Sequence, residues 1–366
     1  MNGSSMLPSK ETEAWDGGMA VACVILVLSF LVGAPGNLLV IWTILRHIEK
    51  RSHTVVLILH LAVADLLVLV TLPLWIYSLA HSWVFGEGMC KAVVYVINSS
   101  MYGSVFIITL MSVERFVAIR YPFASISWRK KDLLTKVLLA LWALAFLFSV
   151  PVIPTQVVDE VGEREQCLFR DYSSVSQEVV CLLLETLMGF VVPFSVLVVC
   201  YSCVCSRIAR MTFKAKQKST LLITSVVAVF GLCWTPHHVG NALSLVAMAI
   251  QEWHPSASKS LEEARGTMAL IAGAMAFISS TANPLLYLCA ARSFRSSLRD
   301  TGMRKLFRHI SSSATGERNK ELSFVSKRQS STQQECTLCS SDSKIQATDT
   351  QDTDAVQLNL YEQIIL

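Results

Sequence analysis

The hydrophobic residues of this chain fall into long blocks separated by short polar stretches. Seven blocks are long enough to cross the hydrocarbon core of a bilayer, which takes roughly 20 helical residues. Within a block the apolar pattern is continuous: residues 24–31 are apolar except for Ser29. A membrane β-strand would alternate polar and apolar residues, so the blocks are predicted to be helices. Their expected limits are 19–45, 54–80, 90–120, 134–154, 178–206, 219–250 and 267–291.

The pattern therefore predicts an all-α fold, a seven-transmembrane helix bundle over residues 19–291 that follows an N-terminal segment, residues 1–18. Composition supports a membrane protein, because 53% hydrophobic and 16% charged residues are too apolar a mixture for a soluble domain of this length. Residues 292–309 place basic and large apolar residues near helical spacing, which predicts a short amphipathic helix on the membrane surface. Residues 310–366 are rich in Ser, Thr, Gln and Asp and are expected to form a disordered cytoplasmic tail.

The distribution of basic residues predicts the orientation in the membrane. Thirteen Lys and Arg residues lie around the loops after the first, third and fifth blocks, and five lie in the alternate loops. Because basic residues near span ends stay on the cytoplasmic side, we expect a multi-pass plasma-membrane protein with an extracellular N-terminus and a cytoplasmic C-terminus. Asn2 opens an Asn-Gly-Ser glycosylation acceptor on the predicted outer side. The net charge of +4 then reflects topology and does not indicate nucleic-acid binding.

Two of the 11 cysteines lie on the predicted outer side at informative places. Cys90 opens the third block, and Cys167 lies in the polar stretch between the fourth and fifth. A disulfide between them would tie the second outer loop to the top of the third span. The alternative is a pair of free thiols.

Ionisable residues inside a span are costly and mark functional sites. Asp65 is the only charged residue of the second block, with His counted as neutral. Together with polar residues of other spans it predicts a hydrated cluster that holds a cation, most simply an allosteric sodium ion; no other cofactor is expected. The alternative is a neutral, protonated Asp65 that is hydrogen-bonded to the same groups. These groups are Asn37, Ser104, Ser279, Ser280 and Asn283.

An acidic and a basic residue, Glu114 and Arg115, are adjacent at the inner end of the third block. Ser104 lies 11 residues earlier, close to three helical turns, so Ser104 and Arg115 share a face that points into the bundle. A guanidinium that pairs with Glu114 in one arrangement and is released in another is a two-state element suited to signalling. The alternative is a basic side chain that only anchors the helix at the membrane surface.

Prolines inside the blocks predict helix hinges, because each removes one backbone hydrogen bond. They occur at Pro193, Pro236 and Pro284. Trp234 precedes Pro236 by two residues, and Phe230 lies one turn earlier on the same face. A bulky ring beside a kink can convert ligand contact into helix rotation.

The ordered set of motifs resembles the span signatures of rhodopsin-like (class A) G-protein-coupled receptors, over roughly residues 19–308. The motifs are Gly36-Asn37, Leu61-Ala62-Val63-Ala64-Asp65, Glu114-Arg115-Phe116, Trp142, Cys233-Trp234-Thr235-Pro236 and Asn283-Pro284-Leu285-Leu286-Tyr287.

That resemblance implies a receptor that activates a heterotrimeric G protein, with Arg115, Tyr201 and Tyr287 as switch residues. Where the family has Asp-Arg-Tyr, this chain has Glu-Arg-Phe, which keeps both charges and loses a hydroxyl. The resemblance also implies arrestin and receptor kinases as partners through the tail, where Ser311 to Ser313 and Ser330 to Thr332 are candidate phosphorylation sites.

Within the family the chain is most similar to leukotriene B4 receptors, which implies a small lipid agonist, a dihydroxy fatty acid. It also implies coupling to inhibitory G proteins of the Gi/o family in chemotaxis and inflammation. The stretches that carry this similarity are Lys50-Arg51-Ser52, Ser100-Met101-Tyr102-Gly103-Ser104-Val105, Leu184-Glu185-Thr186-Leu187-Met188-Gly189-Phe190 and His238-Val239-Gly240-Asn241.

The residues that match polar pocket positions of that group are Tyr102, Glu185, His237 and Asn241. A lipid also needs an apolar slot, which Met101, Phe190 and Trp234 are expected to line. An alternative for His237 and His238 is a place in the protein core.

Two departures leave the cation for the ligand carboxylate open. A histidine of the third span in one receptor of the group is Val94 here, and an arginine near the top of the fourth span is Gln156. The candidates for that cation are Arg265 and Arg170.

Rival functions differ in their sequence requirements. A receptor for a peptide or chemokine-like chemoattractant is the nearest alternative, since Glu11, Glu13 and Asp16 give the N-terminus an acidic character. A retinal protein needs a lysine in the last span, and residues 267–291 contain none. The spans also bring together no Ser-His-Asp, paired-carboxylate or metal-ligand set, so we expect no enzyme.

Overall fold

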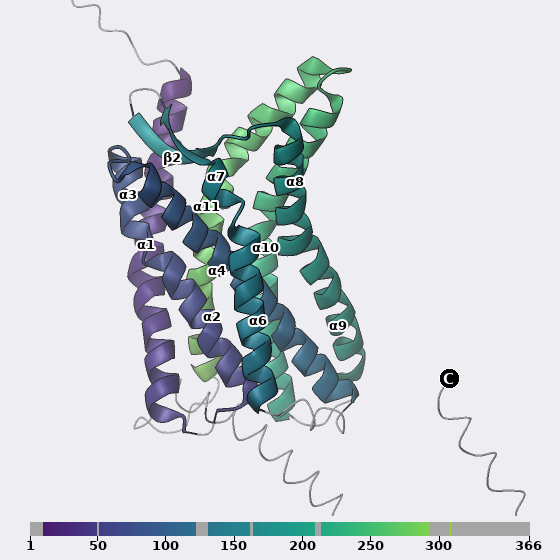
Figure 1. Ribbon diagram of the computed structural model, residues 1–366. Helices are drawn as coiled ribbons and strands as arrows, with labels where there is room; N and C mark the ends of the chain where they lie inside the picture. The colour runs from purple at the N-terminus through teal and green to yellow at the C-terminus, as the bar shows by residue number, and fades with distance from the viewer. Residues whose placement is uncertain are drawn as a thin grey trace, which may run out of the picture. The chain divides into compact units, whose positions relative to one another are not determined.

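The computed structural model describes residues 10–49, 51–121, 131–161, 164–208, 214–292 and Arg308. The chain divides into two units, Met1–Gly316 and Glu317–Leu366, and all the described residues belong to the first. Seven helical segments of this unit are long and apolar enough to span a membrane, which confirms the predicted all-α bundle. Figure 1 shows them side by side.

Four of the seven spans are single helices that run through the bundle without a break: α1 (Lys10–His47), α4 (Gly86–Arg120), α10 (Lys214–Ile250) and α11 (Pro255–Arg292). The other three spans are interrupted. The second span consists of α2 (His53–Leu69) and α3 (Leu72–Ala80), and the fourth of α6 (Lys131–Ser149) and α7 (Val152–Thr155). The fifth consists of α8 (Val175–Thr186), the π-helix η1 (Leu187–Val191) and α9 (Val192–Ile208).

All three interruptions lie next to prolines, and Pro151 immediately precedes α7. The break between α2 and α3 precedes Pro73, which has no N–H to continue the helix, and the Thr71 hydroxyl donates instead to the Val68 carbonyl at 2.7 Å. The five-residue π-helix ends two residues before Pro193. In contrast, α10 and α11 continue through Pro236 and Pro284, so of the three predicted hinges only Pro193 is accompanied by a change of helix type.

Two helices begin nine or more residues before the expected span limits. Helix α1 begins at Lys10 and not at residue 19, and α11 begins at Pro255 and not at residue 267. Hydropathy detects the lipid-embedded part of a helix, whereas the added turns of α11 are polar. They pack on the end of α10, where the Ser258 hydroxyl donates to the Ala247 carbonyl at 2.9 Å. The pair projects past the neighbouring helices at one end of the bundle (Figure 1).

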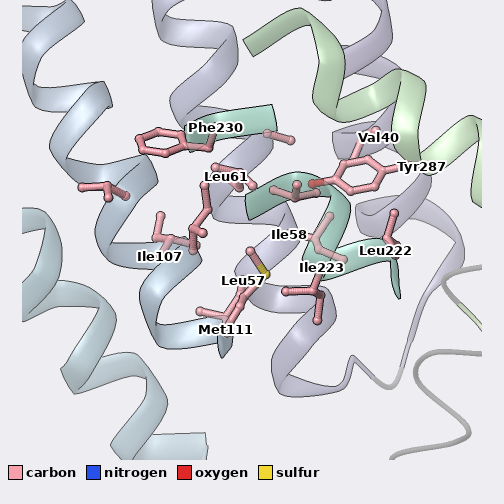
Figure 2. Packing of buried hydrophobic residues seen from close by; sticks show 14 of the residues in the cluster. Val40, Leu57, Ile58, Leu61, Ile107, Met111, Leu222, Ile223, Phe230 and Tyr287 are labelled. Atoms are coloured by element: carbon pink, nitrogen blue, oxygen red, sulfur yellow. The ribbon is translucent and has the colours of Figure 1, made fainter. Parts of the chain in front are cut away.

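The core lies where α2, α4, α10 and α11 face one another, and Figure 2 shows its side chains interlocking. Close backbone approach supplements this packing, as expected for helices in lipid. A Cβ atom at Gly36 would lie 2.9 Å from Cγ of Pro284, so only glycine lets α1 approach α11 this closely. Representative buried core residues are Val40, Ile58, Leu61, Met111, Phe230 and Tyr287.

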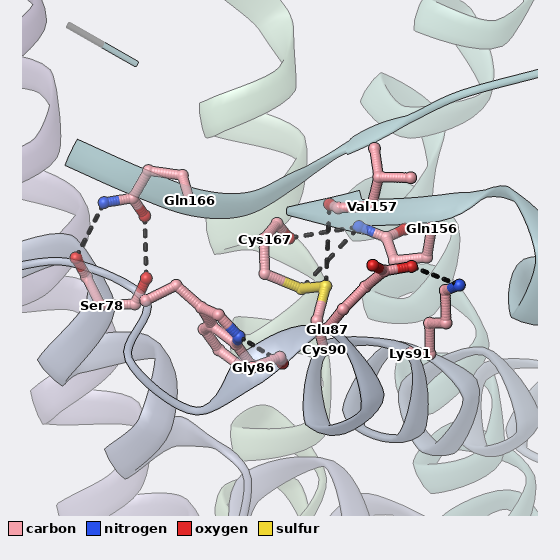
Figure 3. The surroundings of a disulfide bond; sticks show 10 residues. Ser78, Gly86, Glu87, Cys90, Lys91, Gln156, Val157, Gln166 and Cys167 are labelled. Atoms are coloured by element: carbon pink, nitrogen blue, oxygen red, sulfur yellow. Dashed lines mark hydrogen bonds and ion pairs between the residues drawn. A yellow bond between two sulfur atoms is a disulfide. The ribbon is translucent and has the colours of Figure 1, made fainter. Parts of the chain in front are cut away.

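An antiparallel hairpin, β1 (Gln156–Val161) and β2 (Arg164–Arg170), covers one end of the bundle, which we call the hairpin end. Its first and last residues, Gln156 and Arg170, are direct cross-strand partners. The predicted disulfide is present: Cys167 of β2 is joined to Cys90 of α4, with a Cα–Cα distance of 5.7 Å. Two hydrogen bonds also tie Gln166 to Ser78: the Ser78 hydroxyl donates to Gln166 Oε1 at 2.8 Å, and Gln166 Nε2 donates to the Ser78 backbone carbonyl at 2.9 Å (Figure 3). These links hold Arg170 over the interior of the bundle.

Candidate functional site

A cavity of about 420 Å³ opens toward the hairpin end, and six of the seven predicted ligand-binding residues line it. This size suits a drug-sized or lipid-mediator ligand, since such sites measure about 300–1,000 Å³. The seventh residue, Tyr102, is buried and lines a separate cavity of about 20 Å³ on the other side of Glu185. The six are Met101, Glu185, Trp234, His237, Asn241 and Arg265; the second candidate cation, Arg170, lines the cavity as well, whereas Phe190, which was expected in the apolar slot, does not.

Glu185 is the polar centre of the larger cavity. The Arg170 guanidinium approaches both of its carboxylate oxygens, with Nη1–Oε2 at 2.9 Å and Nη2–Oε1 at 3.4 Å. His237 Nε2 lies 2.9 Å from Glu185 Oε1. The carboxylate is 5% exposed and is therefore neutralised by its neighbours and not by water. The side chains of Arg170, Glu185 and His237 therefore connect β2, α8 and α10.

Electrostatic interactions and burial keep Arg170 charged and Tyr172 neutral, so both side chains can donate hydrogen bonds. The Glu185 carboxylate raises the pKa of Arg170 above its ordinary value, so the guanidinium stays protonated. Burial raises the pKa of Tyr172, which also lines the cavity, so its phenol remains a neutral donor. A partly buried cation with several fixed donors can bind carboxylate and hydroxyl groups.

The two adjacent histidines have different surroundings. His237 lines the cavity, whereas His238 is buried and stacks on Phe190, with ring centroids 4.7 Å apart. His238 therefore fits the alternative of a core residue. Asn241, one turn beyond His237, donates from Nδ2 to the Thr186 hydroxyl at 3.3 Å, which orients its amide at the cavity wall.

The two candidate cations have different partners. Arg265 lies at the rim, half-exposed, and its Nε donates to Glu262 Oε2 at 2.8 Å. Arg170 lies deeper and is bound to Glu185. Gln156 donates from Nε2 to the Cys167 carbonyl at 3.3 Å. Because Arg170 is its cross-strand partner, the hairpin places the Arg170 guanidinium next to Gln156 at the cavity wall.

Trp234 separates the ligand cavity from a cavity of about 10 Å³ beneath it, and lines both. Its ring centroid lies 5.8 Å from that of Phe230, as the predicted ring pair requires, and Pro236 lines the upper cavity. Contact with a ligand above can therefore reach the polar cluster below.

The predicted ion-site residues meet in this lower cavity. Asp65 is 3% exposed, and Asn283 Nδ2 donates to its Oδ2 at 2.7 Å. The cavity offers about the space of one water molecule and is lined by carboxylate and hydroxyl oxygens, which suit sodium. Asn37 lies beside the cluster and donates to the Ser280 carbonyl at 3.1 Å. The described residues hold no group of three His, Cys, Asp or Glu side chains that would suit a transition metal. The remaining lining residues include Ser104, Ser279 and Ser280.

Glu114 and Arg115 meet at a residue that the sequence did not single out, Thr54 of α2. The Thr54 hydroxyl donates to Glu114 Oε2 at 3.2 Å and accepts from Arg115 Nη2. No ion pair joins Glu114 directly to Arg115 in the described part of the chain, so one hydroxyl serves both charged groups. Nearby, Tyr201 and Tyr287 pack on the bundle core, Tyr287 with 1% exposure (Figure 2). We call this the Arg115 end.

The sequence pattern of the family described as 7 transmembrane receptor (rhodopsin family) matches residues 36–287. This chain belongs to that family. The receptor is 35% identical over 277 residues to leukotriene B4 receptor 1 of Homo sapiens, covering 74% of this chain and 76% of the relative. It is 33% identical over 324 residues to leukotriene B4 receptor 2 of Rattus norvegicus, covering 86% and 88%. It is also 33% identical over 303 residues to apelin receptor A of Danio rerio, covering 77% and 82%.

The family establishes a multi-pass membrane receptor that signals through a G protein and is not an enzyme. Several sequence predictions lie outside the described residues: the glycosylation acceptor at Asn2, the tail phosphorylation sites and all of the amphipathic helix at 292–309 except Arg292, the last residue of α11, and Arg308.

Sequence reasoning missed two functional neighbours. The partnership of Arg170 with Glu185 follows from the hairpin register, which loop composition does not reveal. For Thr54 the only usable signal was its position in the sequence. It carries a hydroxyl near the start of the second span, at the depth predicted for Glu114.

Proposed function

We propose that this receptor binds leukotriene B4, or a closely related dihydroxy fatty acid, in the cavity of about 420 Å³ and activates an inhibitory G protein. The carrying observation is the arrangement of Arg170, Glu185, His237 and Asn241 along one wall of an otherwise largely apolar cavity. A hydroxylated fatty acid presents the complementary pattern, a few polar groups on a long hydrocarbon chain. Similarity to receptors named for leukotriene B4 supports this ligand class.

The polar wall supplies the chemistry for both kinds of polar group on such a ligand. Arg170 and the Asn241 amide donate hydrogen bonds, and Glu185 and His237 offer acceptors. In this proposal the ligand hydroxyls bind Glu185, His237 and Asn241, and the carboxylate is paired by Arg170 or by Arg265 at the rim.

At the other end of the bundle, release of Arg115 from Thr54 frees a cation to bind the G protein. The proposal includes the orientation expected from the basic loops, with the hairpin end outside and the Arg115 end in the cytoplasm. The proposal also includes chemotactic and inflammatory signalling, glycosylation at Asn2, and binding of arrestin and receptor kinases through the tail.

The test is the response of cells that express the receptor to a panel of eicosanoids and chemoattractant peptides. We expect leukotriene B4 to lower cyclic AMP at nanomolar to micromolar concentration and to displace a radiolabelled copy of itself from membranes. Membranes that carry the surface-expressed receptor and show no saturable leukotriene B4 binding would refute the ligand assignment. A rise in cyclic AMP would refute the inhibitory coupling.

A peptide chemoattractant is the second candidate. The similarity to apelin receptor A and the exposed acidic residues of the hairpin, Asp159, Glu160 and Glu165, favour it. The discriminating variant replaces Glu11, Glu13 and Asp16 with their amides. A receptor for a basic peptide should lose affinity for that peptide, whereas a lipid receptor should keep its affinity for the lipid.

A further inference from the structure

The ligand cavity has a second arm that none of the predicted site residues reaches. It extends between α1, α3 and α11, and its lining there is hydrophobic. Of the residues that line it, those from α1 and α3 are all hydrophobic and buried. We call this the apolar arm, defined by Ala22, Leu26, Trp75, Leu79, Gly273 and Phe277.

The apolar arm lies across the bundle from the polar wall. Glu185 and His237 come from α8 and α10, while α1 and α3 lie on the opposite side of the hairpin end (Figure 1). Both sets line one continuous cavity. Such a cavity fits a molecule with polar groups at one part and hydrocarbon at another, because burying hydrocarbon is favourable whereas burying a polar group without a hydrogen-bond partner is costly.

The absence of a side chain at Gly273 adds space to the apolar arm. A Cβ atom at Gly273 would meet no other atom within 4 Å, and Gly273 lines the cavity, so the space beside it belongs to the arm. Gly266 lies on the same helix and has equally open surroundings, but it is not among the lining residues of the described chain. The two glycines therefore form a matched pair, one inside the arm and one outside it.

We infer that the apolar arm is the subsite for the hydrocarbon tail of the ligand and that Gly273 sets the length of tail the receptor accepts. The inference rests on the proposed lipid ligand. With the polar groups bound near Glu185, the tail points away from α8 toward Leu26 and Leu79. Each methylene group buried there adds to affinity, so preference for long over short tails measures occupancy of the arm.

The test compares leukotriene B4 with an analogue shortened by four carbons at its methyl end, in competition binding to wild type, Gly273→Leu and Gly266→Leu. In wild type the long ligand should bind more tightly. Gly273→Leu fills the arm and should reduce this preference by at least about tenfold, the effect of roughly two buried methylene groups, with the short analogue changed less than about threefold. Gly266→Leu should keep the wild-type preference.

The inference fails if Gly273→Leu weakens both ligands equally or leaves the preference unchanged. Should Gly273→Leu not reach the cell surface, Leu79→Ala provides the converse test. This change lengthens the arm and should shift preference about threefold or more toward an analogue extended by two carbons, and an unshifted preference refutes the inference. If wild-type receptor binds neither ligand, the proposed function has failed, which is a different result from a lost or unchanged preference.

Discussion

Arg170 at the end of β2 and Glu185 in α8 form a two-pronged ion pair, with one nitrogen–oxygen distance of 2.9 Å and a second of 3.4 Å. The pair connects the disulfide-anchored hairpin to the helix bundle. It also places a carboxylate and a guanidinium, each partly satisfied by the other, at the wall of the ligand cavity. A ligand that binds Arg170 or Glu185 either replaces their ion pair or adds a further partner to it. Ligand binding at the hairpin end is therefore coupled to the positions of α8 and α10.

Replacing Glu185 with Ala should weaken leukotriene B4 binding by about 1–3 kcal/mol, because the change leaves buried hydrogen-bonding groups of Arg170, His237 and the ligand without a partner. Radioligand competition on membranes measures the effect. Glu252→Ala, which removes an exposed carboxylate at the end of α10, is the control and should bind as wild type does. Unchanged affinity in Glu185→Ala would remove Glu185 from the binding site.

Breaking the disulfide with Cys167→Ser should lower both thermal stability and ligand affinity. The bond closes a loop with a sequence separation of 77, and loss of such a native disulfide costs about 2–5 kcal/mol in small domains. Affinity should fall as well, because β2 carries Arg170. Thermal unfolding in detergent and radioligand binding report the two effects. Cys181→Ser, which alters a free cysteine, should preserve stability, and a Cys167→Ser receptor with wild-type affinity would contradict the role given to the hairpin.

Removing the Thr54 hydroxyl should raise basal signalling. Thr54→Val keeps the shape of the side chain but leaves Glu114 and Arg115 without their shared partner, a loss of about 1–3 kcal/mol from the arrangement seen here. We expect severalfold higher agonist-independent nucleotide exchange on the G protein. Thr54→Ser retains the hydroxyl and should restore low basal exchange. Equal basal exchange in Thr54→Val and wild type would show that this hydroxyl does not hold the switch.

Asp65 should make agonist affinity sensitive to sodium. If the cluster around Asp65 holds sodium in the inactive arrangement, raising sodium at constant ionic strength, with choline as the replaced cation, should weaken agonist binding severalfold. Asp65→Asn removes the only carboxylate of the cluster and should abolish this dependence. Sodium that weakens binding equally in Asp65→Asn and wild type would place the ion elsewhere.

The seven spans could be predicted from the sequence because hydropathy over about 20 residues is a local property that the bilayer itself selects. The helix ends could not, since α11 begins in a polar stretch whose folding depends on packing against α10. The ion-site residues were also predictable, because a buried carboxylate such as Asp65 needs polar neighbours at the same depth.

The sequence by itself determined the membrane bundle and the disulfide partners, which follow from the composition of segments and the places of two cysteines, and its resemblance to leukotriene B4 receptors pointed to several of the polar residues of the cavity. Only the tertiary structure decided which groups share a contact. Arg170 meets Glu185 and His237, Thr54 meets Glu114 and Arg115, and Leu26 lines the same cavity as Gly273. The physical reason is that these contacts join helices and strands distant in the chain, so they depend on how the helices pack, which no local pattern specifies.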